Sequence, residues 1–237
     1  MGNAGLVGDL HRLIAFDLDG TLVDSRRDLA DSANDLITEL GGAPLPEEAI
    51  ARMVGEGAAV LVRRALMAAG VTDARAAVRR FLEIYDTRLL RHTRFYAGME
   101  ESVRFARTLG RVAVLTNKPL GPSERILNGL GVRDLFDFVV GGDGPLPRKP
   151  DPSSLNALMH QAGAAAATSL LVGDSPIDHE TAVRAGVRCC IVSFGFGCET
   201  FPNARLRPED SVVPDAGALR DVLAAFGRDC QRLNGSS

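Results

Sequence analysis

The long gap between the first two predicted strands constrains the fold of this chain more than any other feature. The short apolar run at residues 13–18 is typical of a buried strand, and the next strand pattern begins only at residue 111. A unit of two parallel strands and a connecting helix needs about 30 residues, so roughly 70 residues of this gap are surplus. Apolar side chains in the surplus recur at helical spacing. The sequence therefore predicts a helical domain, residues 24–93, inserted after the first strand.

Beyond the insert, strand patterns alternate with helical patterns along the chain. This alternation predicts strand–helix–strand units, which build a parallel sheet covered by helices. We therefore predict the α/β fold class, with a doubly wound parallel sheet in a Rossmann-like core formed by residues 1–23 and 94–237. The strands are predicted at 13–18, 111–116, 136–140, 169–173, 188–193 and 211–213. The helices are predicted at 27–40, 46–53, 57–69, 73–91, 122–130, 152–162, 177–185 and 215–226, before a frayed polar tail at 231–237.

The composition narrows the class of protein. The chain has 237 residues, of which 46% are hydrophobic and 24% charged, as in an average soluble globular protein. The formal net charge is −3 and neither half is strongly basic, so we expect no nucleic-acid partner. No apolar run reaches the roughly 18–20 residues of a membrane span, and no signal-peptide pattern opens the chain. The four cysteines lack zinc-site spacing, so we expect reduced thiols in a cytoplasmic monomer or homodimer.

Two carboxylates follow the first predicted strand. In the segment DLDGTLVDS at 17–25, Asp17 and Asp19 are two residues apart, and such residues of a strand point the same way. Two close carboxylates repel each other, which raises the pKa of one of them unless a cation lies nearby. Mg²⁺, a hard cation that prefers oxygen ligands, is the natural counter-charge. The sequence therefore predicts a magnesium site after the first strand.

Three further segments carry polar side chains at the ends of predicted strands or the start of a helix. Taken singly, each has a plain structural explanation, because a strand-end aspartate often caps a helix and a lysine before proline is usually solvated. In open α/β sheets, however, sites form outside the carboxyl ends of the strands. Together these groups suit one task, which is to hold a phosphoryl group and a metal ion. The polar groups are Thr116 and Asn117 in LTNKP (115–119), Lys149 in RKPDP (148–152), and Asp174 and Asp178 in VGDSPID (172–178). The lysine of LTNKP adds an ammonium.

In this order, the four segments resemble the haloacid dehalogenase-like phosphohydrolase superfamily. The matching motifs are DxDGT at 17–21, TN at 116–117, the lysine at 149 and GDSxxD at 173–178. The helical insert is similar to the small helical cap domain of that superfamily. The second aspartate of DxDGT favours phosphoryl transfer over dehalogenation, because a halide leaving group needs no acid. The resemblance therefore implies a phosphoric monoester hydrolase with a cap at 24–93.

The resemblance also implies a role for each matched residue. Asp17 would be the nucleophile that attacks phosphorus and forms an aspartyl-phosphate. Asp19 would be the general acid for the leaving group and then the general base for water. Thr116 and Asn117 would hydrogen-bond the phosphoryl oxygens, and Lys149 would neutralise the negative charge of the transition state.

Mg²⁺ is the cofactor that the resemblance implies. Its ligands would be Asp17, the backbone carbonyl of Asp19, and Asp174. Asp178 would lie one step further out and orient Lys149 or a metal-bound water.

Within the superfamily, stretches such as VGEGAAVLVRRAL at 54–66 resemble phosphoglycolate phosphatases. Gly55 and Gly57 precede a predicted helix whose N-terminus is a ready anion site, so they are expected to bind the carboxylate of 2-phosphoglycolate. An alternative is that these glycines only turn the chain between two helices. Glu56 would repel a carboxylate if it faced the substrate, so either it points outward or the substrate differs.

We therefore expect a Mg²⁺-dependent phosphatase of a small phosphorylated metabolite, 2-phosphoglycolate. The same core motifs serve phosphatases of sugar phosphates, nucleotides or pyrophosphate. They also serve phosphosugar mutases, which return the phosphoryl group instead of releasing it. A third class is a non-catalytic binding protein, and the intact Asp17, Asp19, Lys149 and Asp174 argue against it.

Overall fold

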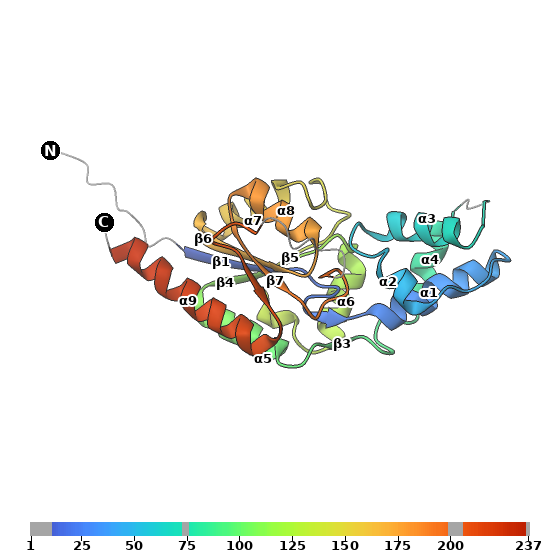
Figure 1. The fold of residues 1–237 in the computed structure, drawn as a ribbon, viewed down its shortest axis with the longest axis horizontal. Coiled ribbons are helices and arrows are strands. Elements are labelled where there is room, and N and C mark those ends of the chain that lie inside the picture. The colour runs from blue at the N-terminus through green and yellow to red at the C-terminus, as the bar shows by residue number, and fades with distance from the viewer. Residues whose placement is uncertain (1–10, 73–75, 199–205, 236–237) are drawn as a thin grey trace.

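A parallel sheet forms the centre of the molecule (Figure 1). The computed structural model describes residues 11–72, 76–198 and 206–235. Within these ranges the strand order is β5-β4-β1-β6-β7-β8, and every neighbouring pair runs parallel. The predicted α/β class with a doubly wound parallel sheet is confirmed. The strands are β1 (His11–Phe16), β4 (Arg111–Leu115), β5 (Phe138–Val140), β6 (Ala164–Gly173), β7 (Arg188–Val192) and β8 (Ser211–Val213).

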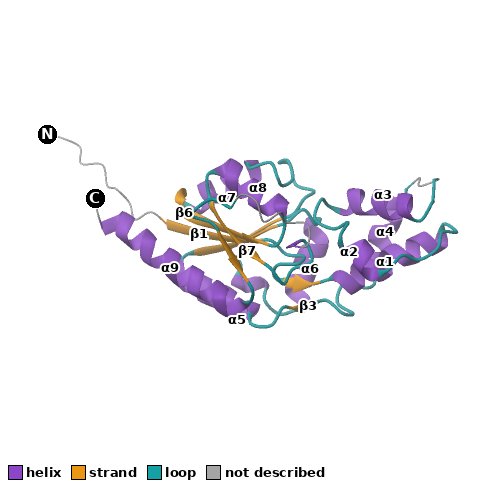
Figure 2. Cartoon of the chain, in the orientation of Figure 1, coloured by secondary structure: helices purple, strands orange, loops and turns teal. Residues whose placement is uncertain are grey.

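Helices cover both faces of the sheet (Figure 2). Successive side chains of a strand point to opposite faces, so Leu13 and Ala15 of β1 pack on one layer, and Ile14 and Phe16 pack on the other. All four are fully buried, which suits the inner strand of a parallel sheet. Helices α7 and α8 form the first layer, and α5 and α9 form the second. The core helices are α5 (Met99–Leu109), α6 (Leu120–Gly129), α7 (Ser153–Ala162), α8 (Pro176–Ala185) and α9 (Ala216–Gly235), with a 3-10 turn η1 (Arg133–Leu135).

Four further helices stand together beyond one end of the sheet, on the right in Figure 1. They bury their apolar faces against one another, with Leu36, Ile37, Leu66 and Phe81 almost free of solvent contact. Most of their stability comes from this packing, because helices this short are marginal alone. We call this group the helical cap. Its helices are α1 (Arg26–Glu39), α2 (Glu47–Ala51), α3 (Ala58–Ala68) and α4 (Ala77–Asp86).

A small antiparallel sheet, absent from the sequence-based prediction, lies where the chain enters and leaves the cap. Strand β2 (Val23–Asp24) pairs with β3 (Arg94–Phe95). Nearby, the buried carboxylate of Asp28 accepts hydrogen bonds from the backbone N–H groups of His92 and Thr93. The two connecting segments are therefore held side by side, although two-residue strands are too short to give a periodic pattern.

Two core elements are longer than the sequence patterns predict. β6 begins at Ala164 rather than near residue 169, because its first residues pair with His11 of β1. α9 extends to Gly235 instead of ending near residue 226 in a frayed tail. Phe226 and Cys230 are both buried one turn apart, so packing continues along the helix.

The cap helices also differ somewhat from the prediction. α4 spans Ala77–Asp86, whereas the pattern covers 73–91, of which residues 73–75 lie outside the described ranges.

In the ranges that the structure describes, no helix has the length and apolar character needed to cross a bilayer.

Candidate active site

The polar residues of the four sequence segments meet at the carboxyl ends of three neighbouring strands. β1 lies between β4 and β6, and its last residue, Phe16, is in register with Val114 and Val172. The residues that follow these strands therefore come together where the strand order reverses, which is the usual ligand site of open α/β sheets. Asp17, Thr116 and Asp174 follow β1, β4 and β6, and all three are buried.

Lys149 lies at the centre of this cluster. Its Nζ is 2.8 Å from a carboxylate oxygen of Asp17 and 2.6 Å from one of Asp178. Burial opposes the charge on Lys149, but the two carboxylates outweigh it and raise the pKa of the ammonium above its ordinary value. Lys149 is therefore a permanent positive charge beside Asp17 at neutral pH.

Asp178 is held by the start of α8. Ser175 caps this helix and exchanges hydrogen bonds with Asp178 in a capping box. One carboxylate oxygen of Asp178 accepts from the N–H groups of Asp174 and Ser175 and from the Ser175 hydroxyl, and the other oxygen faces Lys149. Asp178 is thus fixed in place, with one carboxylate oxygen against the Lys149 ammonium.

Asp17, Asp174 and Asp178 together can hold a metal ion. Each of the three buried carboxylates offers an oxygen within 4.8 Å of the others. Burial raises the pKa of Asp17 to about 6, with Lys149 opposing the rise and the carboxylates of Asp178 and Asp19 adding to it. Burial and the same kind of repulsion raise the pKa of Asp174 well above its ordinary range. The cluster therefore sets three acidic groups against one ammonium, and its all-oxygen donors suit a hard divalent cation.

Gly20 lets the chain pass close to this cluster. Its φ is +88°, and a β-carbon at this position would lie 2.1 Å from a carboxylate oxygen of Asp174. Any other residue here would displace Asp174 or strain the turn. The glycine of the DxDGT motif is therefore required by the packing of Asp174.

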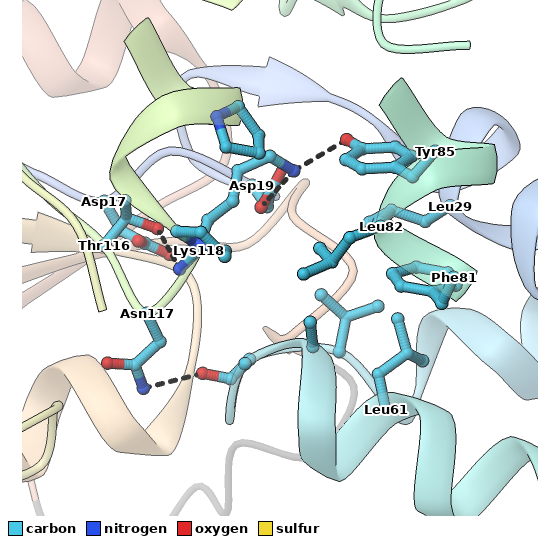
Figure 3. Close-up of a pocket in the computed structure, with 16 residues that line it drawn as sticks. Asp17, Asp19, Leu29, Leu61, Phe81, Leu82, Tyr85, Thr116, Asn117 and Lys118 are labelled. Carbon is cyan, nitrogen blue, oxygen red and sulfur yellow. Dashed lines mark hydrogen bonds and ion pairs between the residues drawn. The ribbon is translucent and has the colours of Figure 1, made fainter. Parts of the chain in front are cut away.

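Asp19 is held by Ser25 and by Lys118. Ser25 donates to one of its carboxylate oxygens at 2.6 Å, and the Nζ of Lys118 lies 3.0 Å from both. Lys118 also donates to the hydroxyl of Tyr85 on α4, at 2.6 Å. The ammonium therefore joins a core carboxylate to the cap, as Figure 3 shows.

Neither Lys118 nor Tyr85 was among the predicted site residues, and Lys118 entered only as the ammonium of LTNKP. The composition could have drawn attention to Lys118. Of the 27 lysines and arginines in the chain just two are lysines, Lys118 and Lys149. Both lysines are buried, and both contact an aspartate of the DxDGT motif. Tyr85 left no comparable signal, since its contact with Lys118 depends on how the cap packs.

Asn117 joins the cap to the core. Its side-chain amide donates to the backbone carbonyls of Gly55 in the cap and Lys149 in the core, both at 2.9 Å. Both amide hydrogens are thus engaged, so a phosphoryl oxygen would have to displace one of these acceptors. The hydroxyl of Thr116 accepts from the N–H of Lys118, and among the described residues nothing accepts the hydrogen of this hydroxyl.

Glu56 does not line the pocket that the cap closes over Asp17. Its carboxylate pairs with Arg64 on α3, and both side chains are partly exposed. Glu56 therefore points away from the pocket, the first of the two alternatives stated for it. Gly55 and Gly57 line the pocket itself.

The pocket between cap and core is polar at the core and largely apolar toward the cap (Figure 3). Asp17, Asp19, Thr116, Asn117 and Lys118 supply the polar side. The remaining lining residues are Leu29, Val54, Gly55, Gly57, Ala58, Leu61, Phe81, Leu82, Tyr85, Pro119 and Pro122.

Comparison with known proteins identifies the family. Residues 14–192 match the family model described as haloacid dehalogenase-like hydrolase. The chain belongs to the haloacid dehalogenase-like hydrolases. The resemblance predicted from the four motifs is therefore confirmed.

Among these hydrolases, the chain is similar to proteins named phosphoglycolate phosphatase. One from Rhodospirillum rubrum is 43% identical over 221 residues, which cover 90% of either chain. Another from Cereibacter sphaeroides is 39% identical, over 89% of this chain and 99% of the relative. A crystal structure of a predicted phosphoglycolate phosphatase from Haemophilus somnus superposes with a TM-score of 0.82 at 30% identity, covering 92% of this chain and 99% of that one. The expected enzyme class, a phosphoric monoester hydrolase similar to phosphoglycolate phosphatases, is confirmed.

Proposed function

We propose that this hydrolase is a Mg²⁺-dependent phosphatase of 2-phosphoglycolate that works through an aspartyl-phosphate on Asp17. The observation that carries the proposal is the position of Asp17. Its carboxylate lies 2.8 Å from the Lys149 ammonium and faces the small pocket that the cap closes. A charged nucleophile beside a fixed cation, away from bulk water, is what transfer of a phosphoryl group requires.

The first chemical step is assigned to Asp17 and Asp19. A carboxylate oxygen of Asp17 attacks phosphorus, and the bond from phosphorus to the ester oxygen breaks. Asp19 gives a proton to that oxygen, which leaves as the hydroxyl of glycolate. The Thr116 hydroxyl donates to a phosphoryl oxygen, and Lys149 offsets the negative charge that builds up.

The second step returns the enzyme to its starting state. Asp19, now a carboxylate, takes a proton from a water molecule that attacks the phosphorus of the aspartyl-phosphate. The bond from phosphorus to the Asp17 oxygen breaks, and inorganic phosphate is released. Ser25 holds Asp19 at 2.6 Å, so the same group serves both steps from one position.

Magnesium fits the donor set. We propose Asp17, Asp174 and the backbone carbonyl of Asp19 as its ligands, with Asp178 beside them holding Lys149. Bound there, Mg²⁺ would draw negative charge from the phosphoryl oxygens and lower the barrier to attack.

The cap gives the pocket its small size. We propose that residues 24–93 close as a unit over a core formed by 1–23 and 94–237, and that Gly55 and Gly57 line the substrate side of the cap. The free space inside the pocket is about 40 Å³, room for a few water molecules. Such a pocket favours a compact cytoplasmic metabolite over a sugar phosphate or a nucleotide.

A substrate screen tests the proposal. Phosphate release is measured with Mg²⁺ from 2-phosphoglycolate, sugar phosphates, nucleotides and pyrophosphate, each with and without a sugar bisphosphate. We expect 2-phosphoglycolate to have the highest kcat/KM, without any need for the bisphosphate. Preference for another ester would contradict the substrate, and conversion of a sugar phosphate to its isomer only with the bisphosphate would indicate a mutase.

A further inference from the structure

Lys118 is the positive charge on the cap side of the site. Among the described residues that line the pocket, it carries the single positively charged side chain, and that side chain is almost fully buried. Its neighbours toward the cap are apolar, apart from the Tyr85 hydroxyl. A second anionic group on the substrate would therefore find its counter-charge here.

Tyr85 adds a hydrogen-bond donor beside this charge. Its hydroxyl accepts from Lys118, and in the described part of the chain nothing accepts its own hydrogen. Tyr85 is only 2% exposed, and leaving a buried donor without an acceptor is destabilising. Burial raises the pKa of Tyr85 to about 12, so the hydroxyl keeps its hydrogen at neutral pH. A carboxylate oxygen next to Lys118 would satisfy this donor.

The two lysines contact different parts of the site. Lys149 contacts Asp17 and Asp178 on the phosphoryl side, and Lys118 contacts Asp19 and the cap. An ammonium is a compact point charge that can turn between partners, unlike the fixed fork of arginine. Ser25 holds Asp19 at 2.6 Å, so Asp19 keeps a partner when Lys118 turns to a ligand.

We propose that Lys118 and Tyr85 bind the carboxylate of the substrate, and that they restrict the enzyme to small phosphorylated carboxylic acids. This inference rests on the proposed phosphatase activity. Tyr85 comes from the cap, so the pair is complete only when the cap lies on the core. Carboxylate binding thus favours the closed cap, which excludes water from Asp17.

The test compares two substrates that differ in the carboxylate alone. Ethyl phosphate carries a methyl group where 2-phosphoglycolate carries its carboxylate, and the readout is the ratio of the two kcat/KM values. Tyr85→Phe removes one oxygen and keeps the ring that stacks on Phe81. We expect the ratio to fall at least about tenfold, because a hydrogen bond to a charged group is lost. Lys118→Met should lower the ratio further, with some loss on both substrates because Asp19 loses a partner.

Two matched variants separate this role from a structural one. Tyr96→Phe removes the other tyrosine hydroxyl, which is buried, has no hydrogen-bond partner among the described residues and does not line the pocket, so the ratio should not change. Ala58→Pro removes a backbone N–H at the first residue of α3, where proline is tolerated and where another anion site could form. If Ala58→Pro lowers the ratio and Tyr85→Phe does not, the start of α3 binds the carboxylate and this inference is wrong.

The remaining outcomes distinguish the inference from the proposed function. Wild-type enzyme that hydrolyses neither ester overturns both. Wild-type enzyme that hydrolyses the two esters equally well keeps the phosphatase but overturns carboxylate recognition. An equal loss on both esters in Tyr85→Phe also overturns it, because the hydroxyl would then serve cap packing alone.

Discussion

At the scale of single residues, the environment of Asp17 decides what its carboxylate can do. It is buried, it faces Lys149 at 2.8 Å, and its pKa is raised by burial to about 6. Replacing it with asparagine keeps the shape of the side chain but removes the nucleophile.

We predict that Asp17→Asn lowers kcat by at least about three orders of magnitude, or about 4 kcal/mol of transition-state stabilisation. Circular dichroism should show an intact fold. Steady-state assays with 2-phosphoglycolate measure the loss, and turnover within tenfold of wild type would rule out Asp17 as the nucleophile.

Asp19 gives a second prediction at this scale. Asp19→Ala removes the proton donor for the leaving group, and general acid–base groups contribute about 10²- to 10⁴-fold. The loss should be greater for alkyl esters than for p-nitrophenyl phosphate, because nitrophenolate leaves without a proton. Initial rates on both esters check this, and equal losses would contradict the acid role.

At the scale of elements, the start of α3 determines how the cap meets the core. Gly57 has φ +88° and ψ 166°, a conformation that costs other residues about 1–3 kcal/mol. A β-carbon there would also lie 3.1 Å from the backbone carbonyl of Asn117 and 2.9 Å from the Arg148 guanidinium. Proline, with its φ near −65°, cannot occupy this position either.

We predict that Gly57→Ala hinders closure and lowers kcat/KM about five- to tenfold or more on every substrate. Gly70→Ala is the matched control, because Gly70 also has positive φ but a β-carbon there would meet nothing within 4 Å. Both variants should lose some thermal stability, measured as Tm, but only Gly57→Ala should lose activity. Equal activity losses would show that closure does not depend on this contact.

The connection between β7 and β8 gives a pH-dependent prediction. Burial opposes the charge of Asp210, but hydrogen bonds from Arg207 and from the Cys189 N–H outweigh it and hold the pKa of this carboxyl below its ordinary value. Its stabilising contribution is therefore present above pH of about 4 and is lost as the pH falls through the lowered pKa.

Asp210→Asn should therefore destabilise the protein by about 1–3 kcal/mol at pH 7, with a smaller difference from wild type at pH 3. Urea unfolding at a series of pH values measures this. Asp134→Asn, at an exposed position, should show no such trend. If the loss in the free energy of unfolding stays constant with pH, the charge of Asp210 does not account for the stabilisation.

At the scale of the whole molecule, we expect the fold not to depend on the proposed metal ion. The apolar layers on both faces of the sheet and the cap core are complete without an ion. We predict that chelation abolishes activity and that Mg²⁺ restores it, while unfolding stays a single cooperative transition without metal. Asp174→Asn should raise the Mg²⁺ concentration for half-maximal activity at least about tenfold. Full activity after exhaustive chelation would contradict a catalytic ion.

The sequence alone determined the parallel sheet, the helical insert and the residues at the strand ends. These features are written in local patterns, because a buried strand needs a continuous apolar run and a helix needs apolar residues at helical spacing. Asp17, Thr116 and Asp174 each follow such a run directly. Their meeting then follows from parallel pairing, which brings the ends of neighbouring strands together.

Only the tertiary structure decided what the cap contributes. The contact of Lys118 with Tyr85, the use of the Asn117 amide on Gly55, and the pairing of β2 with β3 all join segments far apart in the chain. No periodicity encodes such contacts, because they depend on how the cap and the core fit against each other. The sequence thus specifies the reacting groups, and the fit of cap to core specifies the surroundings in which they act.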